Sequence, residues 1–80
     1  MLHLSIITPE EQLCQQEAEL VTLPGALGPF TVLKGHAPLI SHLVEGSIRY
    51  RTSEGEERLI PIRGGFAHIR ENRIECCVEK

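Results

Sequence analysis

The side chains of this 80-residue chain that could take part in chemistry are its four histidines and three cysteines. They are His3, His36, His42 and His68, together with Cys14, Cys76 and Cys77. A metal site needs several such ligands to converge, and no two of the histidines are spaced two residues apart on one strand. Adjacent cysteines on a strand point to opposite faces, so Cys76 and Cys77 are poor joint ligands for one tetrahedral ion. We therefore expect reduced, buried or half-buried thiols, and no metal or other cofactor.

Nucleophilic catalysis would need a cysteine beside a histidine that a third group orients. Cys14 and His36 could form such a pair, but the sequence offers no third member, and we predict no catalytic residues. We expect His36 to hydrogen-bond within its own loop, with Pro38 restricting the backbone after it. Direct contact of His36 with a partner is the alternative. Gly64-Gly65 precedes no helical pattern, so we expect it to serve a turn or bulge and not a phosphate site.

The composition excludes several classes of function. Eleven acidic and eight basic residues give a formal net charge of −3, and the chain has no Trp, one Tyr and two Phe. A surface without a basic patch or aromatic platforms does not suit a nucleic acid. The amino terminus lacks the pattern of a signal peptide, and no stretch approaches the roughly 20 apolar residues of a membrane span. An odd number of cysteines without a secretory signal argues against a disulfide framework.

The elements that must position these side chains have the pattern of strands. Turn signals recur mostly about 8–12 residues apart, which is typical of a sandwich or barrel. Between the turns apolar residues alternate with polar ones, as in 2–6, 48–50 and 74–78. Such alternation buries one face of a strand and exposes the other. Hairpin tips are predicted at 53–56 and 71–72, and no linker or repeat divides residues 1–80, which form one domain.

One segment departs from this pattern. Thr8, Pro9 and Glu11 form a capping box, in which a hydroxyl caps a helix, a proline takes its first position and a glutamate follows. Apolar residues then recur at roughly helical spacing, at 13, 14, 18 and 21. Taken alone, Pro9–Leu20 is predicted to be a helix.

The middle of the chain resembles a known family. Residues 28–40, Gly-Pro-Phe-Thr-Val-Leu-Lys-Gly-His-Ala-Pro-Leu-Ile, resemble the signature loop and strand of the epsilon subunit of F-type ATP synthases. Within them the Gly-His-Ala-Pro-Leu block is intact, and further pieces of the family pattern occur in order at 6–10, 21–25, 45–49 and 64–67. Three positions depart from the pattern: the family's acidic residue is Pro29, a glycine is Thr31, and the proline before the block is Lys34.

The resemblance implies an all-β fold, a flattened ten-stranded β-sandwich or barrel. It also overrides the helical pattern, because strand pairing can outweigh weak local propensity, so we expect Glu11–Leu23 to be extended. The implied function is that of a non-catalytic rotor subunit in the central stalk, which couples the membrane c-ring to the gamma subunit during proton-driven ATP synthesis. We expect it as a peripheral part of the complex, at the cytoplasmic face of the bacterial inner membrane.

The resemblance also implies contact residues. For the gamma subunit these are Thr8 and the stretch 36–43, from which we single out His36, Ala37, Pro38, Leu39 and His42. For the polar loops of the c-ring they are Pro29, Phe30 and Thr31. The loss of the family's acidic residue at Pro29 removes any salt bridge from that position.

Family members usually continue into a C-terminal helical hairpin, which in some bacteria binds ATP or extends to block rotation. This sequence ends at Lys80, just after the last expected strand, so we expect no hairpin, no ATP binding and no inhibition of that kind. Two other interpretations stay open. One is a stand-alone β-sandwich that binds a protein partner, and the other is a small metalloprotein that uses a cysteine with a histidine.

Overall fold

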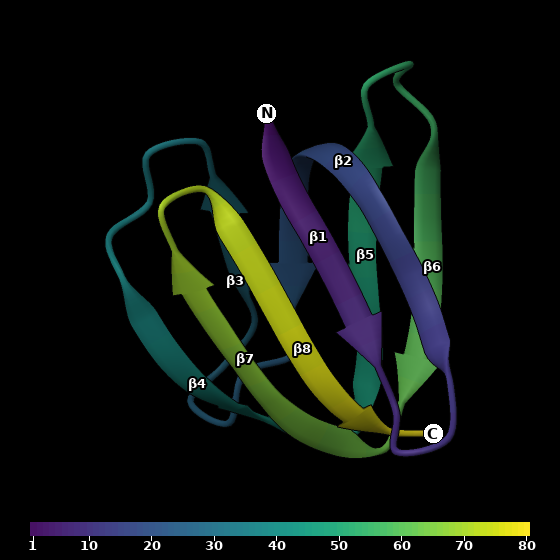
Figure 1. Ribbon diagram of the computed structural model, residues 1–80. Coiled ribbons are helices and arrows are strands. Elements are labelled where there is room, and N and C mark those ends of the chain that lie inside the picture. Colours follow the sequence, from purple (N-terminus) through teal and green to yellow (C-terminus); the bar gives the residue numbers. More distant parts are fainter.

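The computed structural model describes all 80 residues and consists of eight β-strands (Figure 1). They are β1 (Leu2–Ile7), β2 (Gln12–Leu23), β3 (Phe30–Leu33), β4 (Leu39–Leu43), β5 (Gly46–Thr52), β6 (Glu57–Ile62), β7 (Gly64–Arg70) and β8 (Arg73–Glu79). They form one hydrogen-bonded sheet in the order β4-β7-β8-β1-β2-β5-β6, with β3 added to β2. The β1–β8 pair is parallel, and the other pairs are antiparallel. The fold contains no helix that is long and apolar enough to cross a membrane.

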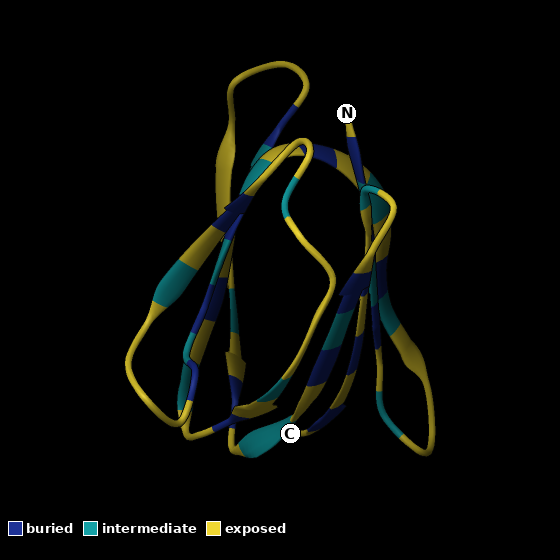
Figure 2. Ribbon diagram, turned by 90° about the vertical axis from the view of Figure 1, so that its left-hand side faces the viewer, coloured by how far each residue is buried: buried dark blue, intermediate teal, exposed yellow.

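The sheet folds into a two-layer sandwich (Figure 2), because β2 (labelled in Figure 1) takes part in both layers. The first half of β2 pairs with β1, and its second half lies between β3 and β5. The register with β5 shifts between Ala18 and Leu20, an irregularity of the kind that bends a strand. Layer A therefore consists of β4, β7, β8, β1 and the first half of β2. Layer B consists of β3, the second half of β2, β5 and β6.

The predicted all-β sandwich is confirmed, but the number of strands is eight and not ten. One continuous strand of 12 residues, β2, serves both layers. The connections before and after β3 close into turns: the Gly28 N–H donates to the Gly25 carbonyl, and the His36 N–H donates to the Leu33 carbonyl, each at 3.0 Å. These segments satisfy backbone groups locally and do not extend into further strands.

The helical pattern in Pro9–Leu20 does not produce a helix. Thr8 Oγ1 does accept the backbone N–H groups of Glu10 and Glu11, at 3.2 and 3.0 Å, as a helix cap would. The Thr8 N–H, however, donates to the Glu11 carbonyl at 2.8 Å, which closes a turn that leads into β2. Most of this segment belongs to β2, which pairs with β1, β3 and β5 and buries four side chains, contacts that a single helix would lose. The expectation of an extended segment is confirmed, except that Glu11 belongs to the turn.

The core between the layers contains 17 buried hydrophobic residues. Buried and exposed residues alternate along the strands, as Figure 2 shows. The apolar residues of the three alternating segments are buried as predicted: Leu2, Leu4, Ile6, Ile48, Tyr50, Ile74, Cys76 and Val78. Period-two alternation was thus sufficient to assign the inward side of these strands.

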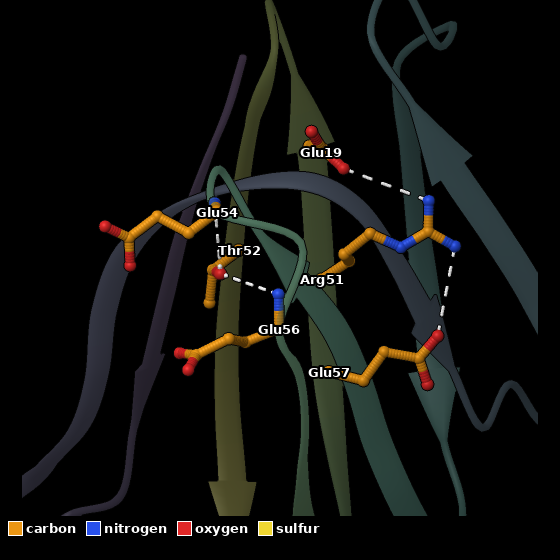
Figure 3. Close-up of polar contacts among 6 residues, drawn as sticks. All are labelled: Glu19, Arg51, Thr52, Glu54, Glu56 and Glu57. Carbon is orange, nitrogen blue, oxygen red and sulfur yellow. Dashed lines mark hydrogen bonds and ion pairs between the residues drawn. The ribbon is translucent and has the colours of Figure 1, made fainter.

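Thr52 is a buried polar residue that organises the hairpin tip at 53–56 (Figure 3). Its Oγ1 accepts the N–H groups of Glu54 and Glu56 at 3.3 and 3.2 Å. Valine has nearly the same shape but no acceptor, so we expect Thr52→Val to lower the free energy of unfolding by about 1–2 kcal/mol in urea denaturation. Thr22→Val is the matched control, because the Thr22 hydroxyl bonds an exposed hydroxyl, and its effect should stay within about 0.5 kcal/mol. A Thr52→Val variant as stable as the parent would contradict this role.

Ion pairs add little to the same hairpin. Arg51 lies 3.8 Å from Glu19 and 3.9 Å from Glu57, with all three side chains substantially exposed (Figure 3). Exposed pairs at such distances typically contribute about 0–1 kcal/mol, because water screens the charges and ordering the side chains costs entropy. The hydrogen bonds to Thr52, not these charges, therefore define the tip.

The three thiols are divided between the core and the surface. Cys14 and Cys76 are buried, whereas Cys77 is exposed. The expectation of buried or half-buried thiols is therefore wrong for Cys77, because alternation along β8 turns its side chain to the outer face of layer A. Burial, followed by the neighbouring Cys77 and Cys14, raises the pKa of Cys76 to about 12.

This division predicts the pattern of thiol reactivity. The thiolate is the reactive form, and Cys76 is both protonated at neutral pH and shielded from solvent. We expect about one thiol per folded chain to react promptly with Ellman's reagent at pH 8, and all three to react in 6 M guanidinium chloride. Cys77→Ala should remove the prompt reaction, whereas a prompt reaction that survives this substitution would show that a core cysteine is accessible.

Candidate docking surface

The outer face of layer A carries a row of exposed, mostly apolar side chains near one end of the sandwich. Cross-strand pairing places His42 of β4 opposite Phe66 of β7, Phe66 opposite Cys77 of β8, and Cys77 beside Ile7 of β1. Ile40 is two residues before His42 on the same face of β4 and is 72% exposed. We call these five residues, Ile7, Ile40, His42, Phe66 and Cys77, the docking surface.

The docking surface surrounds a shallow groove. The groove has a volume of about 440 Å³. Four side chains of the docking surface line it, all except Ile40, together with Thr8. The imidazole of His42 and the ring of Phe66 form one wall, with ring centroids 4.6 Å apart and planes inclined by 47°. Phe66 is 54% exposed and Ile7 is 40% exposed. Large apolar side chains grouped in this way on a surface are typical of a protein–protein contact.

A second groove continues the surface around β4. It has a volume of about 450 Å³ and lies between the loop 25–30 and β4, where Ile40 and His42 form its other side. Leu27 stands at the tip of this loop and is fully exposed. Backbone hydrogen bonds join the loop to β4, because the Ala26 N–H donates to the His42 carbonyl at 2.9 Å. The loop and the docking surface are therefore one contiguous region.

The charge of this face changes along the strands. Beyond the apolar row the outward residues are His68 opposite Glu75, and then Arg70 opposite Arg73, which lies beside His3. The three ion pairs of the molecule join Arg51 of β5 and Arg58 of β6 to Glu19, Glu56 and Glu57, so none of them includes these outward residues of layer A. Glu17 of β2 lies opposite His3 on the same face, so the outer face of layer A is apolar at one end and carries charges of both signs at the other.

Five of the predicted contact residues line the two neighbouring grooves. Thr8 and His42 line the first groove together, and Leu39 lines the second with Pro29 and Phe30. These five therefore meet at one region, although the sequence assigned them to two partners.

Two of the predicted c-ring contacts have internal partners. Phe30 is partly buried and packs against the core. Its ring also packs closely on Gly25, since a β-carbon added to Gly25 would lie only 2.8 Å from the nearest ring atom. Thr31 is on the outer face of layer B, where its hydroxyl lies 2.9 Å from that of Thr22. Pro29 is exposed beside Leu27.

His36, Ala37 and Pro38 lie in the connection between β3 and β4, at the end of the sandwich opposite the Thr8 turn (Figure 1). The prediction that His36 bonds within its own loop is confirmed, since its Nδ1 lies 2.7 Å from the Ala37 carbonyl. Ala37 and Pro38 are exposed. The loop is therefore not part of the groove that contains His42.

The sequence interpretation missed Ile7, Leu27, Phe66 and Cys77. A signal was available for Phe66, because Ala67 and Ile69 are apolar at alternate positions and leave Phe66 on the opposite face. No local signal could place Ile7 beside Cys77, because these residues meet through the parallel pairing of the first and last strands.

No three histidine, cysteine, aspartate or glutamate side chains group in a way that could bind a metal ion. Every buried side-chain nitrogen and oxygen has a hydrogen-bond partner. The most distinctive surface feature is the group of exposed apolar residues, which is suited to binding another protein.

Comparisons with known proteins identify the family. The family of the ATP synthase delta/epsilon chain beta-sandwich domain matches residues 1–80. The chain is 35% identical to the ATP synthase epsilon chain of Desulforapulum autotrophicum, over 98% of this chain and 58% of that protein. It is 43% identical to that of Campylobacter lari, over 92% and 57%. The chain thus spans about three fifths of the length of these relatives.

Solved structures agree on the fold. A chain of the Euglena gracilis mitochondrial ATP synthase, in a structure of OSCP, F1 and c-ring, superposes with a TM-score of 0.92 at 23% identity, over 99% of this chain and 51% of that one. A chain from the central stalk and c-ring of the Tetrahymena thermophila mitochondrial enzyme gives 0.83 at 13% identity, over 99% and 63%. From the sequence match along its whole length, the chain belongs to the ATP synthase delta/epsilon family and represents the β-sandwich domain of an epsilon chain.

Proposed function

We propose that this protein is a non-catalytic subunit of the central stalk of a proton-translocating ATP synthase, which couples the membrane c-ring to the gamma subunit. Membership of the epsilon family and the central-stalk origin of a structural neighbour support this role. The observation that carries it is the docking surface, because a small rigid domain without catalytic groups exposes a contiguous apolar region. The assembly would lie at the cytoplasmic face of the bacterial inner membrane, with this subunit peripheral.

The gamma subunit is the partner that we assign to the outer face of layer A. The contact would centre on the docking surface together with Thr8 and Leu39, and would extend to His36, Ala37 and Pro38 at the other end. Close-packed protein interiors are stiff and transmit strain. A sandwich bound by a partner on one face can therefore transmit a force to its opposite end without deforming. A partner that binds only the folded form would also stabilise an 80-residue domain.

The c-ring is the partner that we assign to the loop 25–30. Pro29 is available for contact there, and the fully exposed Leu27 lies beside it. Phe30 and Thr31 would act indirectly, because their side chains have partners within the domain and support the base of the loop. With no acidic residue at Pro29, this contact would depend on shape and apolar area and not on a salt bridge.

The test is binding to the recombinant gamma subunit of the same organism. We expect a 1:1 complex in size-exclusion chromatography and a measurable dissociation constant in isothermal titration calorimetry. Because apolar surface is buried, the heat capacity change of binding should be negative. A domain that stays monomeric beside folded gamma at 50 μM of each protein would refute the proposal and favour a stand-alone binding module.

A further inference from the structure

Asn72 occupies the tight turn between β7 and β8. Glu71 and Asn72 both have positive φ, at 52° and 63°, which is the conformation of a two-residue hairpin that follows the twist of its strands. Asparagine adopts this region more readily than most residues. The turn by itself, however, would accept glycine equally well, so the side chain of Asn72 calls for a separate explanation.

The side chain and backbone of Asn72 join three distant segments. Its Oδ1 accepts the N–H of Gly35 at 2.7 Å, and its carbonyl accepts the N–H of His3 at 2.8 Å. The β3–β4 connection, the β7–β8 turn and the start of β1 are thereby held together at one end of the sandwich (Figure 1). Gly35 is 37 positions from Asn72 along the chain.

The bond to Gly35 is the one hydrogen bond that ties the loop 34–38 to a distant part of the chain. The other hydrogen bonds of the loop are local: the His36 N–H donates to the Leu33 carbonyl, and the His36 ring bonds the Ala37 carbonyl. Gly35 itself has a φ of 84°, a left-handed conformation that glycine adopts readily and that other residues rarely adopt. Without Asn72 the loop would be attached to the sandwich only through its two strands.

We infer that Asn72 is the positioning residue of the loop 34–38, which it holds in one conformation for a partner that meets His36 and Ala37. The assignment of that partner rests on the proposed function, whereas the attachment of the loop does not. A preformed loop binds without the entropy cost of ordering it on contact. Asn72 therefore acts on affinity through Gly35, without touching the partner itself.

Two substitutions separate the side-chain bond from the turn. Asn72→Gly keeps the positive φ but removes the acceptor, and Asn72→Asp keeps both. Hydrogen exchange of the isolated domain, followed by NMR, should show the Gly35 amide exchanging at least about tenfold faster in Asn72→Gly and near the parent rate in Asn72→Asp. The amide of Ile48, in β5, should be unchanged in both. Equal protection of Gly35 in the parent and Asn72→Gly would overturn the inference.

Binding supplies the readout that a merely structural role would not change. At a temperature where both variants are fully folded, Asn72→Gly should bind the gamma subunit about five- to tenfold more weakly, and Asn72→Asp should bind like the parent. Faster exchange at Gly35 with unchanged affinity would also overturn the positioning role. Failure of the parent to bind gamma would instead refute the proposed function, and the exchange rates would still decide whether Asn72 anchors the loop.

Discussion

Gly65→Ala is expected to lose roughly 3–5 kcal/mol of its free energy of unfolding, the largest effect of any single methyl group in this protein. Gly65 has a φ of 146°, and a β-carbon there would overlap the carbonyl oxygen of Cys77 and lie 2.8 Å from the α-carbon of Val78. Those are backbone atoms of β8, which pairs with β7 along its whole length and cannot move aside. A domain of this size has about 4–12 kcal/mol in total, so much of the variant would be unfolded at 37 °C.

Gly28→Ala is the matched control for this prediction. Gly28 also has a positive φ, 123°, but no atom lies within 4 Å of the position that its β-carbon would take. Its substitution therefore costs backbone strain alone, about 1–2 kcal/mol. Urea denaturation followed by far-ultraviolet circular dichroism measures both variants. If the two losses are equal, close approach to β8 is not the reason for the glycine at 65.

Phe66→Ala is expected to weaken binding to the gamma subunit by about 30-fold or more, the second large effect. Phe66 lies at the centre of the docking surface, between His42 and Cys77, and over half of its surface is exposed. Aromatic residues at the centre of an interface typically contribute 2 kcal/mol or more to binding, which corresponds to this factor. Calorimetric titration gives the dissociation constant. The melting temperature of the free domain should fall only modestly, because just over half of Phe66 is exposed there.

Leu59→Ala is the control that distinguishes this face from apolar exposure in general. Leu59 is 60% exposed, close to the 54% of Phe66, but it lies on β6 in layer B. We expect its substitution to leave the dissociation constant within about twofold of the parent. If both variants bind equally weakly, or if only Leu59→Ala does, the gamma subunit does not bind through the outer face of layer A.

Local chemistry was sufficient for some parts of this fold. Alternation identified the buried side of β1, β5 and β8, because the side chains of a strand project alternately whatever lies around it. The hairpin tips at 53–56 and 71–72 were predicted because few residues tolerate the turn conformations, and the positive φ of Glu71 and Asn72 agrees with this. The hydroxyl of Thr8 also forms the bonds that its capping box predicts.

The same local rules were insufficient for the segment after Thr8. Its spacing favours a helix. It is extended only because β2 pairs with β1, β3 and β5, which come from distant parts of the chain. The family pattern supplied that answer, because it summarises tertiary contacts that a single segment does not contain. The number of strands was wrong for a related reason, since whether β2 is one strand or two depends on how it crosses between the layers.

By itself, the sequence determined the fold class, the inward faces of the strands, the sharpest turns and the family. The tertiary structure alone decided which exposed residues are neighbours. His36 and His42 are close in sequence, yet His36 lies in the connection before β4 and His42 near the far end of that strand. Ile7 and Cys77 come from the first and last strands but are neighbours in one row. The physical reason is that side-chain direction depends on the local backbone, whereas a binding surface depends on strand register, which long-range hydrogen bonds and core packing select together.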